Sequence, residues 1–261
     1  MLSEKTATSE FRYLSNLPFE TDAGIAHEAA IGLIVLATDQ TMEHEFRQIV
    51  RKPGVAFYES RIPNSAQITP ETLREMEALI ADRTEVILPD LHLDVVAFGC
   101  TSAAMVIGEE QVFAQIRKAR PGVACTTPIT AAFAAFDALG AKSIGVLTPY
   151  SDQVNQQVRE YIEKKGYHVP VFGSFNEEDD RIAARITAAS IREAIGKIVK
   201  YHDVGAVFIS CTSLRLAESA AEIEAQIGKP VTSSNHAMAW HCLRLAGIDD
   251  KMTEFGRLYT L

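Results

Sequence analysis

The sequence carries one short polar motif, Cys-Thr-Ser, at two places, and each copy directly follows an apolar run. The copies are Cys100-Thr101-Ser102 and Cys211-Thr212-Ser213. Two further echoes occur in the same order and at nearly the same offset: Ile31-Gly32-Leu33-Ile34-Val35 with Ile144-Gly145-Val146-Leu147-Thr148, and Thr126-Thr127-Pro128 with Ser233-Ser234-Asn235. The Ile-Gly match is expected even between unrelated strand–turn–helix units, because such units resemble one another. The repeated Cys-Thr-Ser is poorly explained by that general similarity. Together the echoes predict two related halves.

Apolar runs rich in Val and Ile alternate with stretches of helical spacing over most of the chain. Such runs are typical of buried parallel strands, and the alternation predicts a parallel sheet covered by helices. The expected strands are residues 31–36, 95–99, 143–147 and 206–210, and the expected helices are residues 41–50, 69–84, 109–120, 129–139, 153–165, 188–201, 217–227 and 237–245. Thr69 is the expected cap of the second helix, with Pro70 in its first turn.

The repeat and the alternation together predict an α/β protein of two pseudo-symmetric flavodoxin-like domains, each a parallel sheet flanked by helices. We expect the active site in the cleft between them, because open α/β sheets bind ligands beyond the carboxyl ends of their strands. The N-terminal domain is expected to comprise residues 1–126 and 234–261, with residues 1–28 as an extension. The C-terminal domain is expected to comprise residues 127–233, so that the chain crosses twice between the halves.

Composition and charge narrow the classes of partner. The chain has 261 residues, of which 47% are apolar and 23% charged, and a formal net charge of −9, which is ordinary for an acidic globular protein. Such a protein is poorly suited to nucleic acid or to an anionic membrane, so we expect neither as a partner. The longest apolar run is far shorter than the roughly 20 residues that span a bilayer. No targeting segment is visible, and a cytoplasmic location is expected.

The two motif cysteines are expected at the carboxyl ends of buried strands, where free backbone N–H groups favour negative charge. That position can lower the pKa of Cys100 and Cys211 and so increase the reactive thiolate fraction. The hydroxyl and N–H groups beside them can hold a carboxylate or a developing enolate. Cys125 and Cys242 lack this motif and are expected to be inert packing residues. No two cysteines are close in sequence, so neither a disulfide framework nor a zinc site is implied.

A pseudo-twofold relation between the halves would bring the two motif cysteines to opposite sides of one cleft. Moving a proton from one face of a planar carbanion to the other needs a base on one side and an acid opposite. A thiolate and its twin thiol supply both, so we expect no cofactor and no metal. The same pair could instead use one cysteine as a covalent nucleophile that adds to an activated double bond.

At these residues the sequence resembles the aspartate/glutamate racemase superfamily, whose members carry one cysteine in each of two pseudo-symmetric halves. Within it, the chain is similar to the branch of maleate cis-trans isomerases, arylmalonate decarboxylases and, closest, the ectoine-utilisation protein A family. The resemblance runs from residue 30 onward and rests on the first strand and turn, both Cys-Thr-Ser motifs, Thr148-Pro149-Tyr150, and the segment from Ser233 to Trp240. It implies Cys100 and Cys211 as catalytic residues and Tyr150 as a ligand of the substrate carboxylate.

The chain departs from the isomerases of this branch in the first turn, where they have an asparagine and it has Asp39. An ionised carboxylate there would repel a dianion and suit a substrate with a positive nitrogen, such as an amino-acid- or ectoine-derived acid. The alternative role of Asp39, at close to even odds, is to cap the helix that begins near Thr41. A second asparagine of the isomerases aligns with Asn176. Arylmalonate decarboxylases keep one of the two cysteines, whereas this chain has both.

These observations predict a cofactor-independent isomerase of the racemase or epimerase type that acts on a small carboxylate and forms a homo-oligomer. The alternatives are a maleate cis-trans isomerase, an arylmalonate-type decarboxylase or, in another class, a protein that binds or senses a small acid without converting it. The predicted catalytic residues are Cys100 and Cys211. The predicted substrate-binding residues are Asp39, Thr101, Ser102, Tyr150, Asn176, Thr212 and Ser213.

Other motifs favour structural roles. The seven histidines have no metal-binding spacing. The acidic run at residues 176–180 lacks the alternating ligands of a calcium loop and is expected to be a solvated loop that leads into a helix. Ser234 or Asn235 is expected to cap the last helix. The aromatic side chains Phe133, Phe136 and Trp240 are expected in the core or at a subunit interface.

Overall fold

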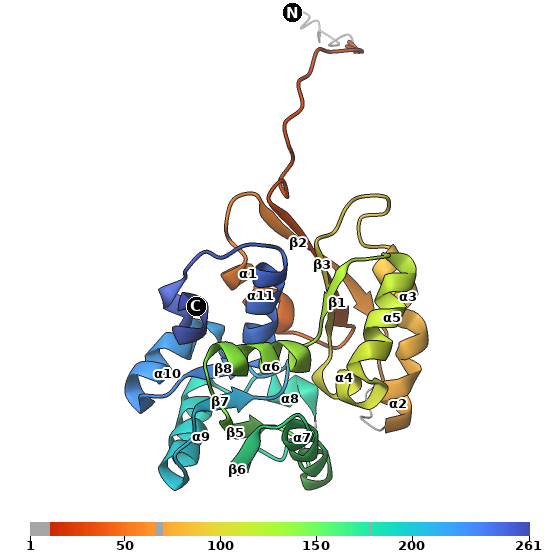
Figure 1. Cartoon of the computed structure of the whole chain (residues 1–261). Helices are drawn as coiled ribbons and strands as arrows, with labels where there is room; N and C mark the ends of the chain where they lie inside the picture. Colours follow the sequence, from red (N-terminus) through yellow and green to blue (C-terminus); the bar gives the residue numbers. More distant parts are fainter. Residues whose placement is uncertain (1–10, 66–69, 178) are drawn as a thin grey trace, which may run out of the picture.

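The computed structural model describes residues 11–65, 70–177 and 179–261, which form two four-stranded parallel sheets (Figure 1). The strand order is β2-β1-β3-β4 in the first sheet and β6-β5-β7-β8 in the second. The strands are β1 (Ala29–Leu36), β2 (Val55–Ile62), β3 (Val95–Gly99), β4 (Ala124–Thr126), β5 (Ser143–Thr148), β6 (His168–Ser174), β7 (Ala206–Ile209) and β8 (Val231–Ser233). The identical strand orders confirm the predicted pair of related α/β halves.

Helices cover both faces of each sheet (Figure 1). On the first sheet, α1 (Met42–Ile49) and α11 (Ser234–Leu245) pack on one face, and α3 (Glu77–Glu85) and α5 (Glu109–Ala119) on the other. On the second sheet, α7 (Asp152–Lys164) packs beside β6, while α9 (Ala188–Tyr201) and α10 (Ala220–Ile227) contact β5 and β8. The shorter or connecting elements are α2 (Pro70–Glu75), α4 (Thr101–Ile107), α6 (Pro128–Ala138), α8 (Asp180–Ala183), η1 (Ala217–Ser219), η2 (Thr253–Phe255) and η3 (Arg257–Thr260).

Helix α1 illustrates why these segments fold as they do. Met42, Phe46 and Ile49 recur at helical spacing and are buried against the first sheet, whereas Arg47 on the opposite side is exposed. The central strands β1, β3, β5 and β7 are almost entirely buried, because helices lie on both of their faces. Continuous apolar runs of this kind are what parallel strands in such sheets require.

Two helices pass between the halves. Helix α6 follows β4 of the first sheet, and its Phe136 ring packs edge-on against Phe208 of the second sheet with the ring centroids 5.5 Å apart. Helix α11 follows β8 of the second sheet, and its Met238 and Leu243 join the cluster that contains Ile31 of the first sheet. The helices α6 and α11 also pack against each other. These crossings are compatible with the boundaries at 126/127 and 233/234, which stay a prediction.

Several local features differ from expectation. The segment predicted as one helix over residues 69–84 forms α2 and α3, which are separated at Met76, and Thr69 lies outside the described residues. Ser233, and not Ser234 or Asn235, caps α11 by accepting the N–H of His236 at 3.2 Å. The strands β2, β4, β6 and β8 and the helices α4 and α8 are additions to the predicted set.

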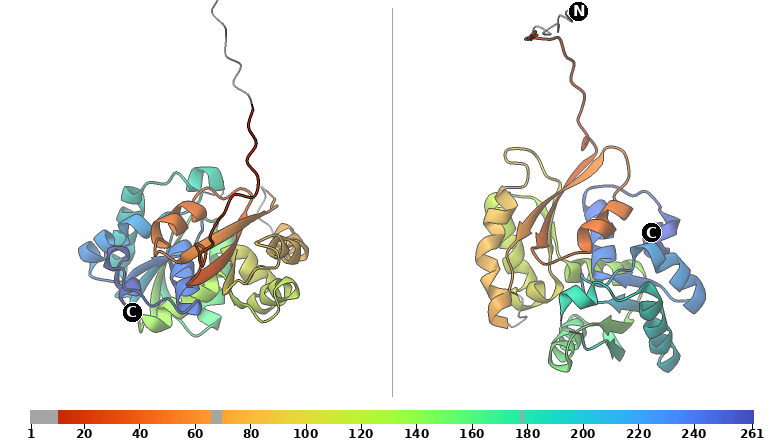
Figure 2. Two further views of the ribbon diagram at one scale, coloured as in Figure 1. Left: turned by 90° about the horizontal axis from the view of Figure 1, so that it is seen from above. Right: turned by 180° about the vertical axis from the view of Figure 1, so that it is seen from behind.

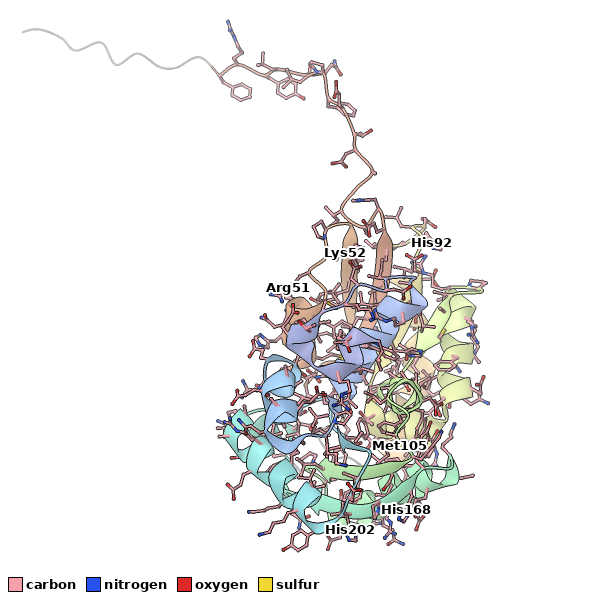
Figure 3. The ribbon with its side chains drawn as sticks, turned by 60° about the vertical axis from the view of Figure 1, so that its left-hand side comes forward. Arg51, Lys52, His92, Met105, His168 and His202 are labelled. Carbon is pink, nitrogen blue, oxygen red and sulfur yellow. The ribbon has the colours of Figure 1, made fainter. Side chains whose placement is uncertain are left out.

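Residues 11–25 form an extended arm that leaves the body of the protein, and Figure 2 shows this arm from two further sides. None of the helices in the described part of the chain has the length and apolar composition needed to cross a bilayer. Figure 3 shows His92 at the opposite end of the protein from His168 and His202. Within residues 11–65, 70–177 and 179–261, no three His, Cys, Asp or Glu side chains are grouped so that they could hold a metal ion.

Candidate active site

One pocket is lined by residues of both halves and contains both motif cysteines. Apolar side chains, among them Leu36 and Met76, line it together with polar ones. Six of the nine predicted site residues lie in its wall: Cys100, Thr101, Ser102, Tyr150, Cys211 and Thr212. The cysteines come from equivalent positions, since Cys100 follows β3 and Cys211 follows β7, the corresponding strand of the second sheet. The two duplicated turns therefore meet at a shared pocket.

Cys100 is the N-cap residue of α4. Its backbone is extended, with φ −141° and ψ 116°, and its Sγ accepts the N–H of Ala103 at 3.4 Å. The Ser102 hydroxyl lies 3.7 Å from the same sulfur. Thr101 directs its hydroxyl to Ser234 of α11, 2.9 Å away, so this part of the wall is tied to the crossing helix.

Cys211 begins a turn, whereas Cys100 begins a helix, so the two identical motifs differ in local structure. Its Sγ accepts the N–H of Ser213 at 3.3 Å. The hydroxyl of Tyr150 also shares a hydrogen bond with this thiol. Tyr150 is itself held in place, because its carbonyl oxygen accepts hydrogen bonds from Asn155 at 2.8 Å and from Ser174 at 2.6 Å.

Burial, and not the strand-end position, controls the protonation of both thiols. It raises the pKa of Cys100 to about 11 and that of Cys211 to about 12. The hydrogen bonds to each sulfur act in the opposite direction, whereas the charge of Asp180 raises both values further. The expected lowering of these pKa values is therefore wrong. With pKa values this high, both cysteines are thiols at neutral pH.

Asp180 lines the pocket and was not predicted as a site residue. The acidic run was expected to be a solvated loop, but Asp180 opens α8, is partly buried and accepts the Ser213 hydroxyl at 3.2 Å. Burial raises its pKa, as do the charges of Asp39 and Asp179. The predicted Asn176 is exposed, and neither Asn176 nor Ser213 is among the residues that line the pocket. The short helix α8 thus brings the carboxyl group of Asp180 into the pocket wall, which the amide of Asn176 does not line.

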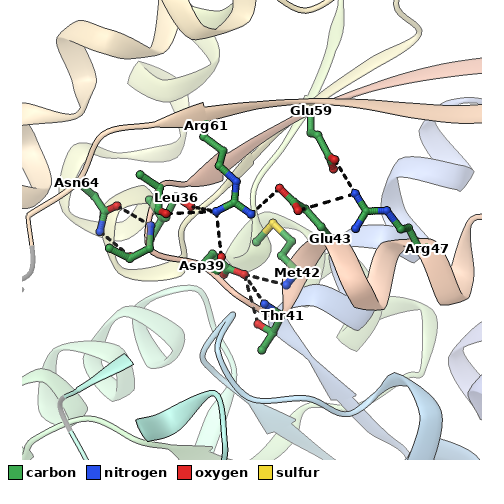
Figure 4. Close-up of polar contacts among 11 residues, drawn as sticks. Leu36, Asp39, Thr41, Met42, Glu43, Arg47, Glu59, Arg61 and Asn64 are labelled. Carbon is green, nitrogen blue, oxygen red and sulfur yellow. Dashed lines mark hydrogen bonds and ion pairs between the residues drawn. The ribbon is translucent and has the colours of Figure 1, made fainter. Parts of the chain in front are cut away.

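Asp39 is buried and holds the beginning of α1. Its Oδ1 accepts the N–H groups of Thr41 and Met42, each at 2.8 Å, so the capping alternative describes its contacts (Figure 4). The carbonyl oxygen of Asp39 accepts a hydrogen bond from Arg61, which also pairs with Glu43 at 2.7 Å. Asp39 is not among the residues that line the pocket. Burial raises its pKa.

A buried polar network joins the first half to the Cys211 turn. Glu45 of α1 accepts the N–H groups of Leu216 and Ala217, each at 2.7 Å. The Thr41 hydroxyl donates to the carbonyl oxygen of Thr212 at 2.5 Å. These contacts hold the second cysteine turn against α1. They had no signal in the sequence, because the partners are about 170 positions apart.

Two parallel sheets of the same strand order, with one cysteine from each half in a common pocket, define an Asp/Glu racemase-like α/β fold. The chain belongs to the arylmalonate decarboxylase family, whose model matches residues 32–259. The chain is 29% identical to a maleate isomerase of Pseudomonas putida over 242 residues, which cover 87% of this chain and 96% of that protein. It is 28% identical to an arylmalonate decarboxylase of Bordetella bronchiseptica over 140 residues, which cover 53% and 58%.

The fold is also found in solved structures of this family. The crystal structure of the maleate isomerase Iso from Pseudomonas putida S16 superimposes with a TM-score of 0.81 at 24% identity and covers 89% of this chain and 98% of that one. A mutant of the Nocardia farcinica maleate cis-trans isomerase with a covalently bound succinylcysteine intermediate gives a TM-score of 0.80 at 23% identity, covering 89% and 98%. The closeness to the ectoine-utilisation protein A family stays a prediction.

Proposed function

We propose that this chain is a cofactor-independent isomerase of the racemase or epimerase type, acting on a small, nitrogen-bearing carboxylic acid that is amino-acid- or ectoine-derived. The observation that carries the proposal is the presence of Cys100 and Cys211 in one pocket, each supplied by a different half. A pair of thiols on two sides of a small acid is what inversion at a carbon centre requires. Membership of a family of isomerases and decarboxylases favours an enzyme over a protein that only binds an acid.

In the proposed reaction, one cysteine as thiolate removes the proton from the carbon next to the carboxylate. The electron pair moves into the carboxylate and gives a planar, enolate-like intermediate. The hydroxyls of Ser102, Thr212 and Tyr150 lie in the pocket wall and would hold the carboxylate while this charge develops. The opposite thiol then donates its proton to the other face. The proton count is unchanged, and the two cysteines have exchanged roles.

The test follows inversion and proton exchange in D2O with a panel of racemisable amino acids. The wild-type protein should incorporate deuterium at the inverted carbon. Cys100→Ala and Cys211→Ala should each stop inversion, while a single variant retains exchange on the face that its remaining cysteine serves. Inversion at the wild-type rate in both variants would exclude this mechanism.

Maleate-type cis-trans isomerisation is the second candidate, and similarity along nearly the whole chain to maleate isomerases favours it. In that reaction Cys100 would add to the double bond as a nucleophile, the bond would rotate, and elimination of the thiolate would release the trans isomer. A malonate-type decarboxylation is a third outcome of the same family. Incubation with maleate and phenylmalonate, followed by analysis of isomers and carbon dioxide, separates both from racemisation. Turnover of maleate alone would overturn the racemase proposal.

A further inference from the structure

The described part of the pocket wall carries an acidic side chain and no basic side chain to compensate it. Asp180 contributes a carboxyl group to the wall, and none of the described residues that line the pocket is Arg, Lys or His. The Ser213 hydroxyl donates to Oδ1 of Asp180 at 3.2 Å and so fixes its orientation. A carboxylate partly removed from water without a cation is costly unless a ligand compensates it.

A second carboxyl group strengthens this field. Asp39 is 5% exposed, and its hydrogen bonds with Thr41, Met42 and Thr212 include no cationic partner. Its charge acts on Asp180 and on Cys100, and the charge of Asp180 acts on both cysteines. The two carboxyl groups and the two thiols therefore share one electrostatic environment. A substrate with two carboxylates would add negative charge to it.

Arg61, which contacts Asp39, and Arg181, which follows Asp180 in the sequence, both pair with other acidic side chains. Arg61 donates to the carbonyl oxygens of Leu36, Ala37 and Asp39 and pairs with Glu43 at 2.7 Å (Figure 4). Arg181 is 77% exposed and pairs with Asp179 at 2.6 Å. Neither guanidinium compensates the carboxyl group of Asp180. The missing positive charge is one that a substrate can bring.

We propose that Asp180 is a specificity-determining residue that binds a cationic nitrogen of the substrate, an ammonium or an amidinium group, so that the pocket selects a zwitterion over a dicarboxylate. This inference rests on the proposed function for its reaction but adds the residue that recognises the nitrogen. It also predicts the orientation of the bound substrate, whose nitrogen would lie on the side of Asp180 and Ser213. A cation there also favours the thiolate form of the neighbouring Cys211, so binding prepares the base.

The test compares two probes with the same four-carbon cis skeleton: maleate, a dianion, and cis-4-aminocrotonate, a zwitterion. Isothermal titration near neutral pH should give at least about tenfold tighter binding of the aminocrotonate to the wild-type protein. Asp180→Asn should remove this preference by weakening the aminocrotonate about tenfold and strengthening maleate. Asp180→Glu, which keeps the charge, should retain the preference.

Asp90→Asn is the matched control, because it removes the same charge from an exposed turn between α3 and β3. Asparagine also adopts the positive φ of 65° at that position readily. It should bind both probes as the wild-type protein does. A wild-type preference for maleate, no measurable binding of aminocrotonate, or an unchanged ratio in a folded Asp180→Asn protein would each overturn the inference. Titration measures binding and not inversion. If both cysteines are needed for inversion but the zwitterion is not preferred, only the proposed role of Asp180 is wrong. If the zwitterion is preferred but no inversion occurs, only the proposed reaction is wrong.

Discussion

Asn235 of α11 donates through its Nδ2 to Oε2 of Glu45 on α1 at 2.8 Å, and through the same nitrogen to the carbonyl oxygen of Thr212 at 2.7 Å. One buried amide thus connects a carboxyl group of the first half with the turn that carries the second cysteine. Glu45 is 1% exposed, and its recorded partners are N–H donors. Burial raises the pKa of Glu45, and these hydrogen bonds oppose that change.

Replacing Glu45 by Gln should loosen the Cys211 turn. Glutamine can still accept the N–H groups of Leu216 and Ala217, but its amide nitrogen then faces Asn235 Nδ2, a second donor. We expect a loss of about 1–3 kcal/mol in the free energy of unfolding. Alkylation of Cys211 should accelerate relative to Cys100, measured by peptide mass mapping. Glu218→Gln, at a side chain 63% exposed, is the control. An unchanged labelling ratio in Glu45→Gln would show that the turn is held by other contacts.

The thiols should titrate at unusually high pH in the ligand-free protein. Because burial raises the pKa of Cys100 to about 11 and of Cys211 to about 12, the rate of iodoacetamide alkylation should keep rising well above about pH 9. In the unfolded chain, the same peptides should reach their maximal rate near an ordinary cysteine pKa of about 8.5. Asp180→Asn should shift the Cys211 profile to lower pH, because it removes a negative charge. A plateau by about pH 9 in the folded protein would contradict this prediction.

Gly99 should tolerate no side chain. A Cβ at this position would lie 2.5 Å from Met42 Sδ and 2.8 Å from the carbonyl oxygen of Ile34, which is backbone and cannot move away. Gly99→Ala should therefore lower the free energy of unfolding by about 1–3 kcal/mol. Gly196→Ala in α9 is the matched control, because nothing lies within 4 Å of its Cβ and alanine favours the helix by about 0.5–1 kcal/mol. Urea unfolding of both variants measures the two shifts, and the prediction fails if they have the same sign.

His236 should make stability fall on acidification. Its Nε2 lies 2.8 Å from the carbonyl oxygen of Phe255, and burial lowers its pKa to about 4 from 6.5. Below pH 6.5 the unfolded chain binds a proton that the folded protein excludes, so stability is lost as pH falls from about 6.5 to about 4. This contribution is about 3 kcal/mol over the full window. Urea unfolding across that pH range should give a flatter profile for His236→Gln than for the wild-type protein. His168→Gln, at an exposed position, should keep the wild-type slope.

The central strands could be predicted from sequence, but the outer ones could not. The strands β1, β3, β5 and β7 are buried on both faces and therefore read as apolar runs. The strand β2 lies at the edge of its sheet, and Glu59 and Arg61 alternate with its more buried positions. The strands β4 and β8 have three residues each, too few to establish a period. Pattern reasoning detects burial, so it misses strands that are half-buried or very short.

The site could be predicted as far as the repeat and the family resemblance extend, and the resemblance added Tyr150 to the pocket wall. Cys100 and Cys211 were located because equivalent strands deliver equivalent turns to one pocket. Asp180 was missed because its direction depends on the packing of the short helix α8 beside Ser213, a contact 33 positions away in the chain. The pKa values of the thiols were misjudged for a related reason. The motif places donors near each sulfur, but only the assembled fold determines how completely water is excluded.

The two helices that change sides, α6 and α11, also limit how the pocket can open. Each carries the chain from one half to the other, and the two are packed together. Two domains joined by one chain connection can rotate relative to each other in many directions. Two adjacent connections leave mainly one rotation, about the line that joins the connections. Substrate entry should therefore occur by a hinge rotation of the two halves about the α6–α11 pair, which moves the two cysteine turns apart.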